Sequence, residues 1–220
     1  MARNQLFSIP NVFLVLFLSV FIKTAFAFDL PSPLFHAAIE GNVSEIASAI
    51  DAGANVDKRD KEGRTALMFA SDPLVIETLL DHGANIHARS NSGESALMIA
   101  AQWRRPVEVL ESLIDHGVDI DARNKEGWTA LMSAAMVRDF QGGEGIVEAL
   151  IQHGANIGAS SNEGWTAPMV AARFNKPFML ETLIDHGADA GHIPLHLLED
   201  NPNISQSEDI YWRIHDAQYD

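Results

Sequence analysis

The sequence predicts an all-α solenoid of short, stacked helix pairs, and two recurring signatures carry this prediction. The first is a glycine followed, after one variable residue, by Ser or Thr, Ala and an apolar pair. It occupies Gly63–Met68, Gly93–Met98, Gly127–Met132 and Gly164–Met169. The second closes each unit and occupies Ile50–Ala54, Leu80–Ala84, Ile114–Val118, Ile151–Ala155 and Ile184–Ala188. Repetition at a period of about 20–50 residues is the mark of an array of stacked units.

The spacing between the two signatures shows which part of each unit is fixed. From the glycine that closes one unit to the glycine that opens the next, the distance is ten residues at all four junctions. From the helix-opening Ser or Thr to the closing glycine, it varies from 18 to 25 residues. A stack requires this pattern, because each turn must fall in register on its neighbour while the loop inside a helix pair is free to vary.

Local residue choices predict where the helices of each unit begin and end. A Ser or Thr side chain at the start of a first helix accepts the orphan backbone N–H groups there. The expected N-cap residues are Thr65, Ser95, Thr129 and Thr166. Apolar residues at helical spacing over 75–80 and 107–114 predict amphipathic second helices. Each second helix should end at its closing glycine, in the left-handed conformation of a C-cap.

Several units depart from the average length, and each departure predicts a local difference. The second unit is three residues short, so we expect a tight loop around Ser71–Pro73. The fourth unit is long, which predicts a bulging loop over 138–144. The last turn, Gly187–Gly191, is too short for a hairpin. We expect Ile193–Asp200 and Glu208–Gln218 to form a terminal helix pair that shields the end of the stack.

These motifs resemble the ankyrin repeat, in which a β-turn is followed by two antiparallel helices. The resemblance covers about Pro31 to Gln218 and implies an ankyrin-type solenoid of about five repeats plus a C-terminal capping helix pair. Within an ankyrin-repeat domain over 28–220, the expected units are 31–60, 61–90, 91–124, 125–161 and 162–189, with the cap over 190–218. Methionine replaces the family's usual histidine at Met68, Met98, Met132 and Met169.

Residues 1–27 predict an export signal. They contain no acidic residue, and Arg3 precedes an apolar run from Val12 to Ile22. Ala25 and Ala27 supply the small residues that a signal peptidase requires, so we expect cleavage after Ala27 and a periplasmic or secreted protein. The run is shorter than the roughly 20 residues of a bilayer span. An uncleaved membrane anchor is the alternative, whereas no membrane contact is expected after cleavage.

Composition narrows the classes of function. The chain of 220 residues has no cysteine, which excludes a disulfide scaffold, a thiol nucleophile and a cysteine zinc site. Its net charge is −15, so nucleic acid is disfavoured as a ligand and a basic protein partner is favoured. No phosphate loop, serine-hydrolase elbow or zinc-protease motif is present. We therefore expect no enzymatic activity, no metal and no cofactor.

Histidines recur once per unit without predicting a metal site. They are His82, His116, His153 and His186. Equivalent positions in neighbouring helices lie roughly 8–10 Å apart, whereas zinc needs nitrogens within about 2.1 Å. His192 and His196 are four residues apart, but Pro194 interrupts a helical register between them. A metal-binding or enzymatic role centred on this C-terminal cap is kept as an alternative hypothesis, as is a structural spacer without a dedicated partner.

The resemblance implies a protein-binding surface made of turn tips and the adjoining concave face. The residue after each opening glycine varies while its flanks repeat, which is expected where a partner is contacted. These residues are Arg64, Glu94, Trp128 and Trp165, and the polar tips beside them are Lys61, Glu62, Lys125, Glu126, Asn162 and Glu163. Trp103, Arg104 and Arg105, in an inter-helix loop, form a second candidate, since Trp and Arg often carry interface energy.

The sequence therefore predicts a monomeric, exported protein–protein interaction module. An inhibitor or immunity-type protein and a chaperone-like assistant are the roles that we consider. For Trp128 and Trp165 the alternative to partner contact is that each ring only covers the neighbouring turn.

Overall fold

The computed structural model describes residues 33–136, 143–174, 177–199 and 208–218. The predicted export signal and most of the predicted bulge over 138–144 lie outside these residues. The helices, in chain order, are α2 (Pro33–Glu40), α3 (Val43–Asp51), η1 (Ala66–Phe69), α4 (Pro73–Asp81), α5 (Ala96–Gln102), α6 (Val107–Asp115), α7 (Ala130–Ala135), α8 (Gly143–Gln152), α9 (Ala167–Arg173), α10 (Pro177–Asp185), α11 (Leu195–Glu199) and α13 (Glu208–Ala217).

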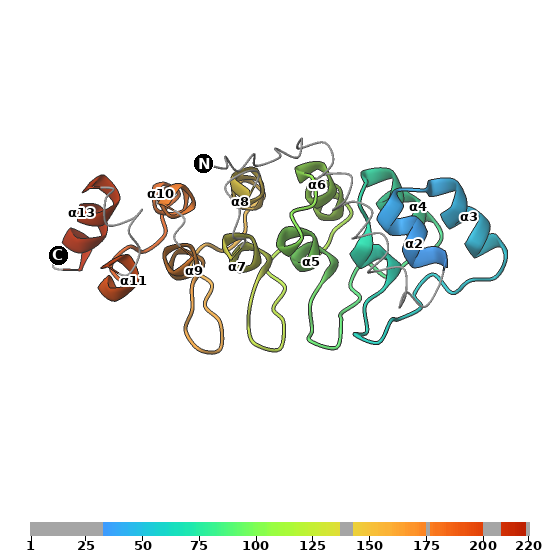
Figure 1. The fold of residues 1–220 in the computed structure, drawn as a ribbon, viewed down its shortest axis with the longest axis horizontal. Helices are drawn as coiled ribbons and strands as arrows, with labels where there is room; N and C mark the ends of the chain where they lie inside the picture. Colours follow the sequence, from blue (N-terminus) through green and yellow to red (C-terminus); the bar gives the residue numbers. More distant parts are fainter. Residues whose placement is uncertain (1–32, 137–142, 175–176, 200–207, 219–220) are drawn as a thin grey trace, which may run out of the picture.

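Pairs of these helices stand side by side in one row, which confirms the predicted all-α solenoid (Figure 1). The first helix of each pair packs on the first helix of the next, as α5 does on α7 and α7 on α9. The second helices form a parallel layer, in which α4 packs on α6 and α6 on α8. Each unit therefore contacts mainly its neighbours, and stability accumulates along the row.

One apolar core runs between the two layers along the whole row. It extends from Leu34 in the first pair to Ile214 in the last, and its small side chains lie where the first helices approach one another. Ala100, Ala134 and Ala171 are all buried. Alanine at these positions allows close helix packing because a larger side chain would hold the helices apart.

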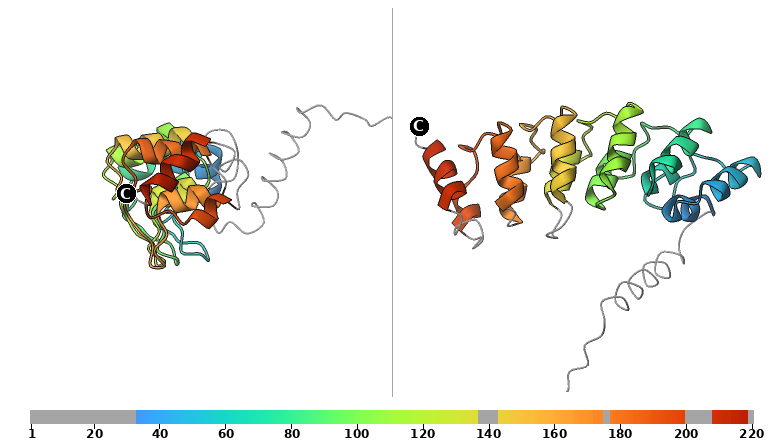
Figure 2. Two further views of the ribbon diagram at one scale, coloured as in Figure 1. Left: turned by 90° about the vertical axis from the view of Figure 1, so that its left-hand side faces the viewer. Right: turned by 90° about the horizontal axis from the view of Figure 1, so that it is seen from above.

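Four long turns, which we call fingers, project from the same side of the row (Figures 1 and 2). They cover residues 53–64, 83–94, 117–128 and 154–165. Each finger is closed by two hydrogen bonds across its tip. In the first finger, the Asp60 N–H donates to the Arg64 carbonyl at 3.0 Å and the Arg64 N–H donates to Asp60 Oδ1 at 2.7 Å. The same pair of bonds recurs in the other three fingers.

Neighbouring fingers are joined by backbone hydrogen bonds at their tips, which we call the finger ladder. The Asn91 N–H donates to the Glu62 carbonyl at 2.7 Å, and the Asn162 N–H donates to the Glu126 carbonyl at 2.9 Å. At the junction between these two, the Lys125 N–H donates to the Ser92 carbonyl at 2.9 Å. The constant ten-residue spacing in the sequence is explained by this ladder, because an insertion would shift one tip out of register with the next.

The ladder also explains why a glycine opens each unit that is followed by another finger. A Cβ atom on Gly63 would lie 2.9 Å from the Asn91 backbone nitrogen, and one on Gly127 would lie 2.8 Å from that of Asn162. These distances are too short for carbon and nitrogen in contact, so any side chain would push the fingers apart. The closing glycines have the expected left-handed conformation, with φ from 83° to 93° at Gly53, Gly83, Gly117, Gly154 and Gly187.

The second unit loses its missing residues mainly from its first helix. Only the tight loop was expected, but the first helix is itself reduced to the four-residue 3₁₀ helix η1. The Met68 N–H there donates to the Thr65 carbonyl at 3.1 Å, which leaves the Thr65 hydroxyl without the predicted capping bond. Ser95 and Thr129 do cap their helices, whereas the Thr166 side chain makes no capping bond.

The C-terminal helices α11 and α13 cap the row without a fifth finger. The turn at 187–194 passes directly from α10 to α11, as its length predicted. A Cβ on Gly191 would lie 2.7 Å from the Ala217 carbonyl oxygen, so this turn packs closely on the end of α13. Arg213 holds the cap to α10 by an ion pair with Asp185 at 2.7 Å, and this contact raises the pKa of Arg213.

We predict that Gly127→Ala destabilises the protein more than Gly164→Ala. Both glycines have similar left-handed φ angles, 81° and 85°, so the backbone strain of the substitution is matched. Only Gly127 faces a neighbouring finger, because a Cβ on Gly164 would meet nothing within 4 Å. We expect about 1–2 kcal/mol of strain in both variants and a further loss in Gly127→Ala alone. Equal losses in urea unfolding would contradict the ladder.

Candidate binding surface

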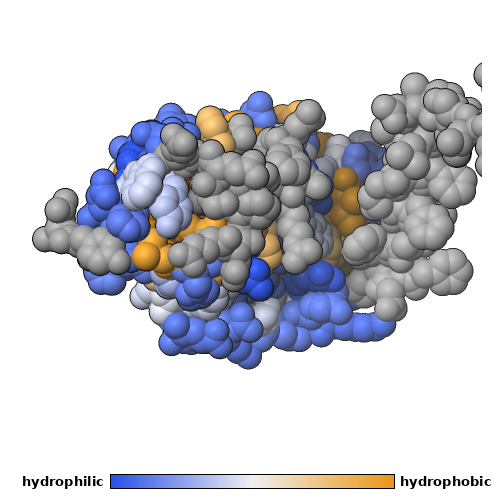
Figure 3. All heavy atoms as spheres, turned by 60° about the vertical axis from the view of Figure 1, so that its left-hand side comes forward, coloured by the Kyte–Doolittle hydropathy of each residue, from blue (hydrophilic) through white to orange (hydrophobic). Residues whose placement is uncertain are grey.

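The six predicted tip residues lie at the exposed ends of the fingers. Lys61, Glu62, Lys125, Glu126, Asn162 and Glu163 are all exposed. The fingers that carry them form a hydrophilic lower edge of the molecule in Figure 3. Because the finger ladder fixes the backbone beneath them, these side chains stand in a row on a rigid support.

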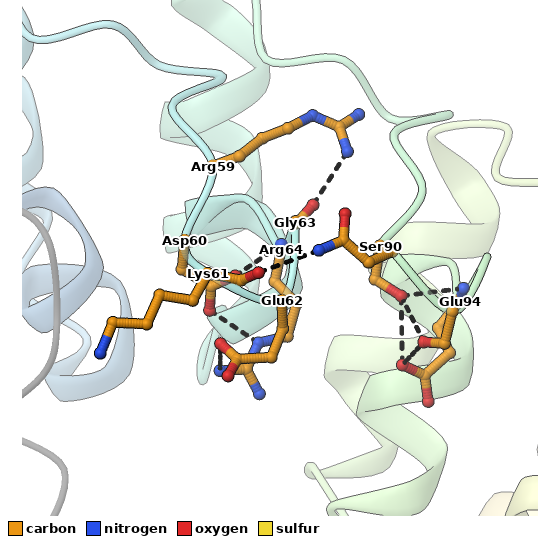
Figure 4. Close-up of polar contacts among 10 residues, drawn as sticks. Arg59, Asp60, Lys61, Glu62, Gly63, Arg64, Ser90 and Glu94 are labelled. Carbon is orange, nitrogen blue, oxygen red and sulfur yellow. Dashed lines mark hydrogen bonds and ion pairs between the residues drawn. The ribbon is translucent and has the colours of Figure 1, made fainter.

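Arg64, the first of the predicted contact residues, is held within its own finger (Figure 4). Its Nε atom lies 2.7 Å from Asp60 Oδ2, and its Nη2 atom lies 3.1 Å from Glu62 Oε2. The Asp60 side chain is only 4% exposed. A carboxylate buried to this degree needs a cation beside it, so Arg64 stabilises the finger whether or not a partner is bound.

Arg64 also meets Trp103, which the sequence suggested as a separate candidate. The Arg64 guanidinium lies over the Phe69 ring at 4.8 Å and over the Trp103 ring at 5.7 Å. Arg105 stands 5.8 Å from the Trp103 ring and donates from Nη2 to the Phe69 carbonyl at 3.0 Å. Burial lowers the pKa of the Arg105 guanidinium. We call these four residues the arginine–aromatic cluster.

The cluster contains one residue that the sequence analysis did not single out, Phe69. Phe69 is fully buried, and its ring packs edge-on against Trp103 with centroids 5.4 Å apart. The neighbouring Arg104 has a φ of 55°, the one left-handed non-glycine residue in the described part of the chain. The sequence signal was the run of Trp and two Arg in a short inter-helix loop, but it did not reveal what the run packs against.

Glu94 occupies the position equivalent to Arg64 in the second finger and is likewise held by its own finger. Its Oε2 atom accepts hydrogen bonds from Ser92 Oγ at 2.6 Å and from Ser90 Oγ at 3.2 Å (Figure 4). Its carboxylate is therefore fixed in place and partly exposed, with capacity to accept further bonds.

Trp128 and Trp165 complete the series in the third and fourth fingers. Both rings pack against the core and stay partly exposed. Their backbone N–H groups donate to Asn124 Oδ1 at 2.8 Å and to Ser161 Oγ at 3.1 Å, which fixes the base of each ring. Each ring therefore presents a partly exposed apolar edge beside its finger.

The recurring histidines have a local structural explanation. At all four, the Nδ1–H group donates to the carbonyl four residues earlier at 2.7–2.8 Å, which adds a second hydrogen bond to a carbonyl near the helix end. In the part of the chain that the structure describes, no three His, Asp or Glu side chains are grouped to hold a metal. His192 instead pairs with Asp189 at 2.6 Å.

Among the described residues, no helix is both long and apolar enough to cross a bilayer.

Comparison with known proteins agrees with these features. The family model described as ankyrin repeats (3 copies) matches the chain over residues 14–90, 34–124, 71–159 and 97–194. These overlapping matches together cover more than half of the sequence. Among curated proteins, none matches the chain.

We predict that Arg64→Met lowers the free energy of unfolding by about 1–3 kcal/mol, because it leaves a buried carboxylate without its cation. Lys125→Met is the matched control, since Lys125 is an exposed finger-tip cation, and it should change stability by less than about 0.5 kcal/mol. Urea unfolding of the two variants measures the difference. If both variants unfold like the wild type, Arg64 has no structural role.

Proposed function

Because the chain belongs to the ankyrin-repeat family, whose members generally mediate protein–protein interaction, we propose that it is an exported, non-enzymatic module that holds a protein partner. The finger tips and the adjoining concave face form the contact surface. The family is typically non-enzymatic, and the residues of the fingers serve structure and contact rather than chemistry.

The observation that carries this proposal is the finger ladder beneath the exposed tips. Hydrogen bonds of 2.7–2.9 Å join all four tips through their backbones. A partner that binds the tips therefore does not have to order four separate loops. Pre-organisation of this kind favours binding, because the entropy cost of ordering the loops is met during folding.

Charge supports a basic partner. The chain carries 30 acidic and 15 basic side chains, and the predicted export signal contains no acidic residue. Cleavage of that signal would leave the mature protein more acidic. An acidic surface speeds encounter with a basic protein at low salt, and the effect is lost as salt screens it.

The sequence signal at residues 1–27 supports a periplasmic or secreted location. Without cysteine, an exported protein has no disulfide to stabilise it. Its stability therefore comes from the continuous core and the finger ladder. We propose that the protein acts as a monomer that blocks an enzyme or toxin, or assists another exported protein.

Affinity capture from the exported protein fraction of the source organism tests this proposal. The bait is the mature chain, compared with Lys125→Ala/Glu126→Ala/Glu163→Ala, in which three exposed tip side chains are removed. We expect a specific protein, identified by mass spectrometry, whose yield falls at least about tenfold with the tip variant.

The matched control is Glu77→Ala/Glu108→Ala, which removes two exposed charges from the second-helix layer on α4 and α6. Its yield should equal that of the wild type. Equal capture by all three baits would show that the tips are not the contact surface, and capture of nothing above background would support a structural spacer.

A further inference from the structure

The finger ladder ends at the fourth finger with two unused acceptors. In the first and third fingers, two consecutive tip carbonyls are used by one asparagine of the next finger. Asn162 donates its backbone N–H to the Glu126 carbonyl at 2.9 Å and its side-chain amide to the Lys125 carbonyl at 2.8 Å. Within the described structure, the equivalent carbonyls of Asn162 and Glu163 accept no hydrogen bond, because the cap brings no finger to them.

The fourth finger also lacks a side chain that elsewhere ties the finger bases together. Four residues after the closing glycine, Asp57 accepts a hydrogen bond from the Asn85 N–H at 2.9 Å. Asp121 does the same for the Asn156 N–H at 2.8 Å. In the fourth finger this position is Gly158. It has no side chain to reach the turn at 187–194, which we call the cap turn.

A second bridging position changes in the same way. Six residues after the closing glycine, Arg59 donates from Nη1 to the Arg89 carbonyl of the next finger at 2.6 Å. Arg123 reaches towards the following finger at Asn162 Oδ1, 3.5 Å away. The fourth finger has Ser160 here. Both positions that tie the first and third fingers to the finger that follows are therefore small in the fourth finger.

These absences leave a cleft of about 390 Å³ between the fourth finger and the cap turn. Pro168 and Met169 of α9 and Ile157 supply its apolar lining, while Asp189 and His192 come from the cap turn. Met169 is partly exposed, in contrast to the equivalent methionines of the three preceding units, which are at most 2% exposed. Gly164, which follows Glu163 in the sequence, also lines the cleft, so the lining reaches the residue next to the two free tip carbonyls.

We propose that this cleft is a docking site for an extended, basic segment of the partner protein, which continues the finger ladder by donating backbone N–H groups to the Asn162 and Glu163 carbonyls. This inference rests on the proposed function and assigns one part of the contact to a defined place. An extended segment fits because it presents N–H groups at regular spacing, as in strand addition to an open sheet edge.

The chemistry of the cleft selects the side chains of that segment. An asparagine at the docking position would repeat the two-carbonyl contact that Asn91 and Asn162 make within the array. A neighbouring Lys or Arg would meet Asp189 and the exposed Glu163. An apolar side chain would cover Met169. None of the residues that line the cleft is a Lys or Arg, and His192 is already paired with Asp189 at 2.6 Å.

A peptide library tests the inference directly. A phage-displayed library of random 12-residue peptides is selected on the mature protein and counter-selected on Gly158→Arg, which fills the cleft. The backbone at Gly158 tolerates a side chain, because the nearest atom to an added Cβ is Asn156 Oδ1 at 3.5 Å. Gln152→Arg is the control, since it adds the same charge at an exposed position of α8.

We expect the selected peptides to be basic and to bind Gly158→Arg at least about tenfold more weakly than wild type in fluorescence anisotropy. Gln152→Arg should bind them as wild type does. N-methylation of single peptide amides should abolish binding only at the few positions that donate to the finger. Enrichment of no cleft-dependent peptide, or equal affinity for Gly158→Arg and wild type, would overturn the inference.

Affinity capture with the tip variant and with Gly158→Arg as baits distinguishes a failure of this inference from a failure of the proposed function. If its capture falls with the tip variant but is unchanged by Gly158→Arg, the proposed function stands and the cleft is not its docking site. If cleft-dependent peptides are found while no partner is captured, the cleft binds peptides and the proposed function fails.

Discussion

The fold depends on the backbone contact between one finger tip and the next. That contact requires a glycine on one side, because a Cβ there would collide with the neighbouring backbone nitrogen. It also requires equal finger lengths, because the donor and acceptor must meet at the same height in every junction. The helices are under no such constraint, so the unit whose first helix shrinks to a single 3₁₀ turn still fits the stack.

The same constraint separates the side chains of the fingers into those that hold the finger together and those that are exposed. Residues that close or brace a finger, such as Asp60, Asn124 and Ser161, are turned inward and bonded to its backbone. At the tips, the backbone and the side chain of Asn162 serve the ladder, whereas the side chains of Lys125, Glu126 and Glu163 are exposed and can match a partner. Arg64 stands between these classes, because its guanidinium is exposed enough to be reached yet is needed by a buried carboxylate.

Sequence reasoning succeeded where a property belongs to one unit and repeats. The closing glycines, the caps at Ser95 and Thr129 and the shortened last turn all follow from local rules applied in register. It did not find the arginine–aromatic cluster, because Arg64 and Trp103 lie in different units and meet only through the packing of one unit on the next. The open cleft could not be predicted from the sequence. Its only sequence signal is Gly158 and Ser160, and that signal can be interpreted only once the structure shows which bonds the equivalent residues of other fingers make.

The end of the row shows why an array can be capped and still remain open to a partner. The apolar core must be covered, since exposed core faces would associate with one another, and α11 and α13 cover it. The finger edge faces no such penalty, because Asn162 and Glu163 are exposed and polar groups are well solvated by water. In the proposal made above, a partner segment donates to their carbonyls. Capping the helices without capping the fingers therefore covers the apolar core and leaves one finger edge with free backbone acceptors.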